Sequence, residues 1–185
     1  MILANDIKKN DFLKINNKFY KVISIDHVKP GKGGAYINAN MFDIHTLKNN
    51  PKRFNSDEKV EKVFVDQKKV YYSYEEGNDI YFNDEEGEEY IVNKNSDQDQ
   101  LFFPHLEYVI LFFYDNNILF YECPAHCVIQ VKETSSPGNI SSNSGRHNKP
   151  AILENNINIH VPNYITSGQK IKIDIRTLEY LEKVN

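Results

Sequence analysis

At 185 residues, with 40% apolar and 26% charged side chains, the chain has the composition of a globular protein rather than a disordered one. No apolar run approaches the roughly 20 residues that span a bilayer, so we expect no membrane partner. Two cysteines are too few for a disulfide framework and fit a reducing compartment. The first residues also lack the basic and apolar regions of a secretory signal.

Charge is distributed unevenly along the chain. Residues 1–64 carry 12 Lys/Arg against 7 Asp/Glu, a net of +5, and residues 65–126 carry 3 against 14, a net of −11. Residues 127–185 carry 7 against 5, a net of +2. We expect the two basic ends to approach phosphates and the acidic middle to face elsewhere.

The first block, residues 1–64, alternates apolar and polar side chains as strands do. Asn16-Asn17 is a two-residue hairpin connection between two such runs. Residues 46–51 indicate a loop, and the run at 58–65 alternates again. Together these features predict a small, strongly bent β-barrel.

Two alternating runs also flank a glycine-rich segment, which predicts a β-hairpin. The tip of this hairpin comprises Pro30, Gly31, Lys32, Gly33 and Gly34. Pro30 fixes φ and lacks an N–H, and the glycines accept positive φ without side chains. Lys32 should therefore project from a narrow finger as an isolated ammonium. The alternative is an ordinary flexible tip with a solvated lysine. A phosphate-binding loop is excluded because Gly33 replaces its Ser/Thr.

The second block, residues 65–126, predicts further hairpins and one short helix. The runs at 70–74 and 79–83 bracket a turn at 75–78, and residues 90–92 add a strand. Ser96 is the expected cap of a helix that extends to Leu106 and is limited by Pro104. A last hairpin turns at residues 115–117.

The third block, residues 127–185, contains clean alternation at 157–161 and 171–175 and a Ser/Gly/Asn-rich loop at 135–148. Short strands at this spacing suit a five-stranded OB-type barrel. The predicted fold class is therefore all-β.

Cysteine and aromatic residues offer competing interpretations. Cys123, His126 and Cys127 lie within five residues, but a structural zinc site needs a fourth ligand, so small packed cysteines are favoured. The aromatic residues could be stacking platforms for bases, as in OB-folds that bind single strands. Most of them lie in alternating runs and are instead predicted to be part of the core, for example Tyr20, Phe64, Phe112 and Tyr121.

The chain resembles bacterial elongation factor P, the counterpart of the archaeal and eukaryotic factor that carries hypusine. The resemblance begins with residues 26–35, DHVKPGKGGA, which are similar to the functional loop of that family. It continues in order to the end of the chain in SDEKVEKV at 56–63, YYSY at 71–74, KPA at 149–151, VPNYI at 161–165 and IKIDIRTLEY at 171–180.

This resemblance implies three β-barrel domains in an extended L that resembles tRNA. A KOW-like (SH3-like) domain over residues 1–64 would carry the Lys32 hairpin, and two OB-like domains would follow over residues 65–126 and 127–185. It also implies a non-enzymatic translation factor, without cofactor or metal, that binds the 70S ribosome as a monomer between the peptidyl and exit sites. There it would position the peptidyl-tRNA when consecutive prolines stall synthesis.

In this family the tip lysine is usually lengthened by an enzyme, through β-lysylation or aminopentanol attachment, and Lys32 is the matching residue. The residues expected to contact rRNA or tRNA are Lys29, Lys32, Lys149, Lys172, Arg176 and Tyr180. Two departures stand out: residues 139–143 replace the lysine and Gly-Asp-Thr of the family, and Leu178 replaces a glycine. The resemblance implies a bacterial cytoplasmic protein, or a plastid protein as the alternative.

Two other function classes remain open from the residues alone. A general single-stranded RNA-binding protein of OB type would bind free oligonucleotides without a ribosome. A cysteine hydrolase would use Cys123 or Cys127, with His126 as base.

Overall fold

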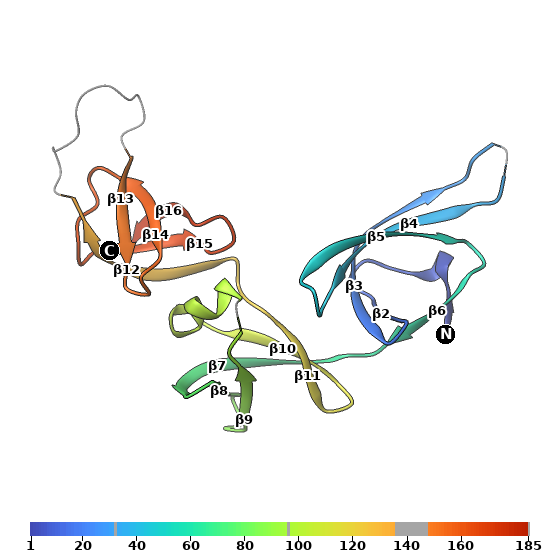
Figure 1. Ribbon diagram of the computed structural model, residues 1–185, viewed down its shortest axis with the longest axis horizontal. Helices are drawn as coiled ribbons and strands as arrows, with labels where there is room; N and C mark the ends of the chain where they lie inside the picture. Colours follow the sequence, from blue (N-terminus) through green and yellow to red (C-terminus); the bar gives the residue numbers. More distant parts are fainter. Residues whose placement is uncertain (32, 96, 136–147, 185) are drawn as a thin grey trace. The chain divides into compact units, whose positions relative to one another are not determined.

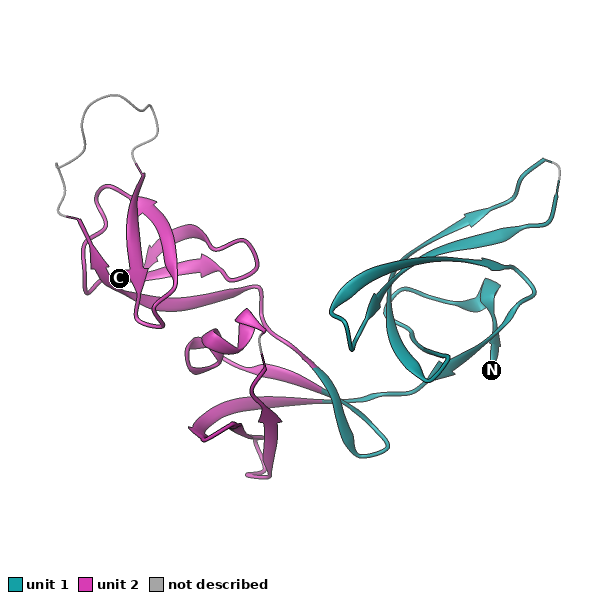
Figure 2. Cartoon of the chain, viewed as in Figure 1, with its two compact units in different colours: residues 1–67, 112–120 teal, residues 68–111, 121–185 magenta. Residues whose placement is uncertain are grey.

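The computed structural model of the chain describes residues 1–31, 33–95, 97–135 and 148–184 (Figure 1). Nearly all regular structure in these residues is β, which confirms the all-β fold class. The chain divides into two compact units, one of residues 1–67 with 112–120 and one of residues 68–111 with 121–185 (Figure 2). The predicted domain limits at 64/65 and 126/127 stay predictions.

The first unit is built on a six-stranded sheet with the order β1-β6-β2-β3-β4-β5. Its strands are β1 (Ile2–Leu3), β2 (Phe12–Ile15), β3 (Lys18–Val28), β4 (Tyr36–Asp43), β5 (Lys48–Asn55) and β6 (Lys59–Val63), and the short 3-10 helix η1 is Ala4–Asp6. Alternate residues of β4 are buried, so Ile37, Ala39 and Met41 form the core with residues of β2 and β3. Asn16 and Asn17 have φ of 51° and 60°, which confirms the predicted two-residue turn.

The strands β10 (Val109–Tyr114) and β11 (Asn117–Glu122) form a hairpin, and the turn of this hairpin belongs to the first unit. The outer parts of both strands, residues 112–120, belong to this unit, and the same strands continue into the second unit. Phe112 is 3% exposed and lies with its ring centroid 5.7 Å from that of Phe12 on β2. Aromatic packing therefore joins two stretches of sequence that lie about a hundred residues apart.

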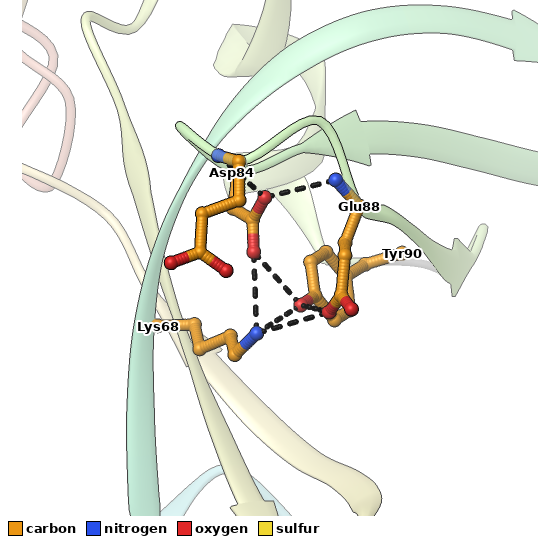
Figure 3. Close-up of polar contacts among 5 residues, drawn as sticks. Lys68, Asp84, Glu88 and Tyr90 are labelled. Atoms are coloured by element: carbon orange, nitrogen blue, oxygen red, sulfur yellow. Dashed lines mark hydrogen bonds and ion pairs between the residues drawn. The ribbon is translucent and has the colours of Figure 1, made fainter.

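The second unit contains the five-stranded sheet β11-β10-β7-β8-β9. The additional strands are β7 (Asp66–Glu76), β8 (Asp79–Asn83) and β9 (Glu89–Asn93). The β7–β8 turn is shorter than expected because β7 continues through Glu76, which leaves Gly77 and Asn78 as the connection. The β8–β9 turn is held by a polar cluster that we call the acidic clip, formed by Lys68, Asp84, Glu88 and Tyr90 (Figure 3).

In the acidic clip, Asp84 Oδ1 accepts the Glu88 N–H at 2.9 Å, and Asp84 Oδ2 lies 3.2 Å from the Lys68 ammonium. Burial raises the pKa of Asp84, but hydrogen bonds from the Glu88 N–H, Tyr90 and Lys68 outweigh it and hold this pKa at about 2. Hydrogen bonds to Tyr90, Glu88 and Asp84 raise the pKa of Lys68 above its ordinary value. Lys68, Asp84 and Glu88 are therefore charged near neutral pH.

The second unit also contains a closed barrel with the strand order β12-β13-β14-β16-β15. Its strands are β12 (His126–Thr134), β13 (Asn148–Leu153), β14 (Asn158–Pro162), β15 (Lys170–Asp174) and β16 (Glu179–Val184). This order, first-second-third-fifth-fourth, is that of an OB-fold, as the spacing predicted. Its core is almost entirely aliphatic and includes Ile129, Val161 and Ile173.

The 3-10 helix η2 (Gln98–His105) links this barrel to the five-stranded sheet. Consecutive side chains enter two different cores, because Phe102 belongs to the cluster of the closed barrel while the Phe103 ring lies 5.1 Å from that of Phe82 on β8. Both are fully buried. The predicted cap was wrong: Asp97 is the N-cap, and its side chain accepts the N–H of Asp99. Ser96 lies outside the described residues.

Two further expectations are corrected. Residues 48–51, expected in a loop, belong to β5, where Pro51 is tolerated because β5 is the edge strand of its sheet. Phe64, expected in the core, is 86% exposed because it follows the last residue of β6 and has left the ladder.

Candidate functional site at the lysine hairpin

The hairpin of β3 and β4 carries the predicted finger, and Figure 1 shows it extending beyond the other strands of its sheet. The two strands pair from Tyr20↔Asp43 to Val28↔Tyr36, with a bulge between Val22 and Ser24. Alternation sets this register, because one face must bury Ile37, Ala39 and Met41. The finger therefore rests on a core that its own strands build.

The base of the tip is supported by a third strand. β5 pairs with β4 as far as Tyr36↔Asn55, and the Ser56 N–H then donates to the Ala35 carbonyl at 3.1 Å. The guanidinium of Arg53 lies 3.5 Å from the centroid of the Tyr36 ring, which is a close cation–π contact. The hairpin is thus braced up to the residue where the glycine-rich segment begins.

The described residues of the tip are exposed and uncovered. Lys29, Pro30, Gly31, Gly33 and Gly34 are all exposed, and a Cβ added at any of the three glycines would meet no described atom within 4 Å. Gly33 has φ of +103°, a conformation that side chains resist. Lys32, the residue that this segment was predicted to present, lies outside the described residues.

Sequence reasoning missed Arg53 at this site. Because residues 46–51 indicated a loop, nothing placed the basic residues that follow beside the finger. The structure puts Arg53 in β5, opposite Asn38 of the finger. The available signal in the sequence was short: polar Arg53 and Asn55 flank apolar Phe54, and the structure leaves Arg53 exposed and Phe54 buried.

The residues of the C-terminal barrel that are predicted to contact RNA differ in their exposure and in their partners. Lys172 is part of an ion pair with Glu182 at 3.1 Å, on exposed surface. Arg176 is 64% exposed in the loop between β15 and β16, and its guanidinium binds both carboxylate oxygens of Asp174, at 3.0 and 2.5 Å. This pairing holds the pKa of Asp174 well below its usual range. Both cations lie at the surface.

Tyr180 is half-buried, and its hydroxyl lies 2.9 Å from that of Tyr164, which is 61% exposed. Burial, together with this hydrogen bond, raises the pKa of Tyr180 to about 12. The Tyr180 hydroxyl therefore remains protonated at physiological pH.

Lys149 requires a correction. Its side chain is only 1% exposed, and the ammonium donates to the Ser135 carbonyl at 2.5 Å. It is therefore not a surface contact for RNA. The sequence held a signal for this, because side chains alternate between the two faces of a strand. Lys149 therefore lies on the same face of β13 as Ala151 and Leu153, which point into the barrel.

The two cysteines are shielded from solvent, because Cys127 is buried and Cys123 is half-buried. Burial raises the pKa of Cys123 above its usual range and that of Cys127 to about 12, the opposite of what a nucleophilic thiolate needs. Cys127 lines a cleft of about 620 Å³ in the second unit, together with His126 and Lys170. In the described part of the chain, no three His, Cys, Asp or Glu side chains are grouped to hold a metal ion. No described helix is both long and apolar enough to cross a bilayer.

Comparison with known proteins identifies the family. Residues 3–60 match the family description "Elongation factor P (EF-P) KOW-like domain", and residues 128–183 match "Elongation factor P, C-terminal". Elongation factor P of Corynebacterium aurimucosum is 36% identical and covers 98% of both chains, and that of Pelagibacter ubique is 34% identical and covers 99% of both. A solved translation initiation factor eif-5a family protein from Naegleria fowleri has a TM-score of 0.49 and 17% identity, over 65% of this chain and 96% of that one. The chain belongs to the elongation factor P family.

Proposed function

We propose that this translation elongation factor binds the ribosome between the peptidyl and exit sites and promotes peptide-bond formation at consecutive prolines. In this proposal the β3–β4 hairpin reaches the peptidyl transferase centre, and Lys32 contacts the end of the peptidyl-tRNA. The factor is not itself an enzyme; it accelerates the reaction by holding the reactants in a productive geometry.

One observation carries the proposal: the tip is built to present a side chain without bulk around it. Its glycines have no described atom within 4 Å of their Cβ positions, while the strands below are braced by β5. A lysine there combines three donors with a flexible stem, which suits the RNA backbone. The exposed cations Lys29 and Arg53 add attraction for phosphates along the same hairpin.

A lysine-modifying enzyme is a proposed partner. Extension of Lys32 by a β-lysyl or aminopentanol group would lengthen the reach of the finger, and an uncovered glycine-rich tip suits entry into the site of such an enzyme. The proposed location is the bacterial cytoplasm, with a plastid as the alternative. The mass of the Lys32 peptide from the native protein would identify the group.

Reconstituted translation of a message with three consecutive prolines tests the function. The wild-type protein should relieve the stall, and it should sediment with RNase-trimmed monosomes. Synthesis at the same rate with and without the factor would refute the proposal.

A general single-stranded RNA-binding protein is the second candidate. It is favoured by Arg176, which lies in the loop between the fourth and fifth strands of an OB barrel, where such folds contact oligonucleotides. Affinity for free oligonucleotides comparable to that for monosomes would support this candidate.

A further inference from the structure

Five aromatic rings pack where the β10–β11 hairpin meets β2 and β3 of the first unit. We call this group, with two lysines, the aromatic clamp: Phe12, Lys14, Phe19, Lys21, Phe112, Tyr114 and Phe120. Phe112 and Phe120 stack at 4.3 Å with an interplanar angle of 18°, and both rings lie 5.7 Å from Phe12. At the other end of the clamp, Phe19 and Tyr114 are 4.9 Å apart.

Two lysines of the basic N-terminal block belong to this clamp. Lys21 Nζ lies 5.3 Å from the centroid of Phe112 and 6.0 Å from those of Phe12 and Phe120. Lys14 Nζ lies 5.5 Å from Phe19 and 5.6 Å from Tyr114. In the register of β2 and β3, Phe12 faces Lys21 and Lys14 faces Phe19. Each lysine is therefore paired with a ring on the neighbouring strand and with the rings of the distant hairpin.

The clamp packs against β3, the strand that leads to the tip. Phe19 and Lys21 are on β3, which continues past the bulge between Val22 and Ser24 to Val28, the last paired residue before the glycine-rich segment.

We propose that the aromatic clamp is a positioning element of the lysine hairpin: by fixing the base of β3 on the β10–β11 turn, it holds this hairpin in one direction within the first unit, and so sets where its tip is presented. This inference rests on the proposed function. Its physical basis is that a misplacement of about 1 Å at a reacting centre can cost on the order of 100-fold in rate, although binding is unchanged. Loosening the clamp then lowers the maximal rate more than the affinity.

A clamp that only stabilised the fold would behave differently. Its variants would melt at lower temperature, but the folded fraction would reach the wild-type rate once enough factor was present. The discriminating quantity is therefore the rate of proline–proline bond formation at saturating factor, separated from the concentration of factor that gives half of that rate.

The test uses full-length Phe120→Leu and Lys21→Met, with Tyr74→Leu as the matched control. Tyr74 is a suitable control because its ring is also stacked, at 4.3 Å on Tyr81, but it lies outside the clamp and is 43% exposed. Both clamp variants should lower the saturating rate by about tenfold or more. The half-maximal concentration should change by less than about threefold, and Tyr74→Leu should change neither quantity.

The outcomes separate this inference from the proposed function. If both clamp variants reach the wild-type saturating rate while Lys32→Ala does not, the positioning role is wrong and the function stands. If the wild-type protein does not relieve the stall, both proposals fail. Should Phe120→Leu not fold, Lys21→Met decides, because this substitution keeps the apolar stem of a half-buried surface residue.

Discussion

Two hairpins of the first unit, β10–β11 and β3–β4, end in opposite ways. The β10–β11 hairpin turns through Asp115 and Asn116, with φ of 48° and 61°, and its flanking rings are packed into the aromatic clamp. The β3–β4 hairpin ends in glycines that meet no described neighbour within 4 Å. One β-hairpin thus packs its end against the unit, and the other leaves its tip exposed. The side chains beside the turn account for the difference.

A third hairpin, β8–β9, ends by yet another chemistry. Its turn is fixed by the acidic clip, in which Asp84 accepts hydrogen bonds from two backbone N–H groups and contacts Lys68 (Figure 3). Apolar rings, charged groups and bare glycine are therefore three ways to end a hairpin in one small protein. The three hairpins should therefore respond differently to mutation, to pH and to ligand binding.

The largest expected effect on stability is that of removing a docked ring. Phe112→Ala should lower the free energy of unfolding by about 3–5 kcal/mol, because Phe112 is 3% exposed and removal of its ring would leave a cavity. Lys29→Ala at the presented tip should change it by less than about 0.5 kcal/mol. Urea unfolding measures both. Equal effects would show that the two tips do not differ as described.

A smaller effect is expected at the docking turn itself. Asn116→Val should destabilise by about 1–2 kcal/mol, because a β-branched residue resists positive φ. Asn116→Gly, which accepts that φ, should be close to neutral and is the matched control. If valine is tolerated as well as glycine, the turn is not under the conformational constraint that its φ values indicate.

At the presented tip, two neighbouring glycines should differ. Gly33→Val should reduce stimulation of proline–proline synthesis several-fold, since Gly33 has φ of +103° and a side chain would force the tip to rearrange. Gly34 does not have a positive φ, and no described atom lies within 4 Å of its Cβ position. Gly34→Val should therefore retain most of the activity. The activity ratio of the two variants is the measurement. Identical activities would mean that the path of the tip is unimportant.

The acidic clip should give the smallest effect, and one that depends on pH. The folded pKa of Asp84, about 2, lies below its unfolded value of 3.8, so its ionisation stabilises the fold above about pH 4. That contribution disappears as pH falls through about 2. Asp84→Asn should therefore be less stable than wild type at pH 7, with the gap closing between pH 4 and 2 in thermal melts. A gap that is constant with pH would show that charge is not what holds this turn.

Much of the fold follows from alternation, and the exceptions have physical reasons. Asn16-Asn17 and residues 115–117 are predictable as turns because Asn and Asp tolerate positive φ, although Asn117 already belongs to β11. The strand at 48–51 was missed because Pro51 argues against a strand, yet an edge strand can spare an N–H. Phe64 was placed in the core because alternation does not reveal where a ladder ends.

The site was predictable in part. The glycine-rich finger could be inferred from local chemistry alone, because exposure follows from the absence of side chains. The position of Arg53 beside the finger follows from the strand β5, which Pro51 conceals in the sequence, and the burial of Lys149 follows from alternation along β13. The clamp around Lys21, in contrast, depends on packing between segments that are distant in sequence. A single sequence does not specify such packing. The basic residues, which look equivalent in the sequence, therefore differ in the structure: Arg53 is exposed beside the finger, Lys149 is buried, and Lys21 is packed in the clamp.

The central claim is that the finger exists to present Lys32, and Lys32→Ala tests it most directly. The rate of proline–proline bond formation at saturating factor should fall to that without factor. The melting temperature and sedimentation with monosomes should remain close to wild type, since no described atom covers the neighbouring glycines. Wild-type stimulation by Lys32→Ala would contradict the account.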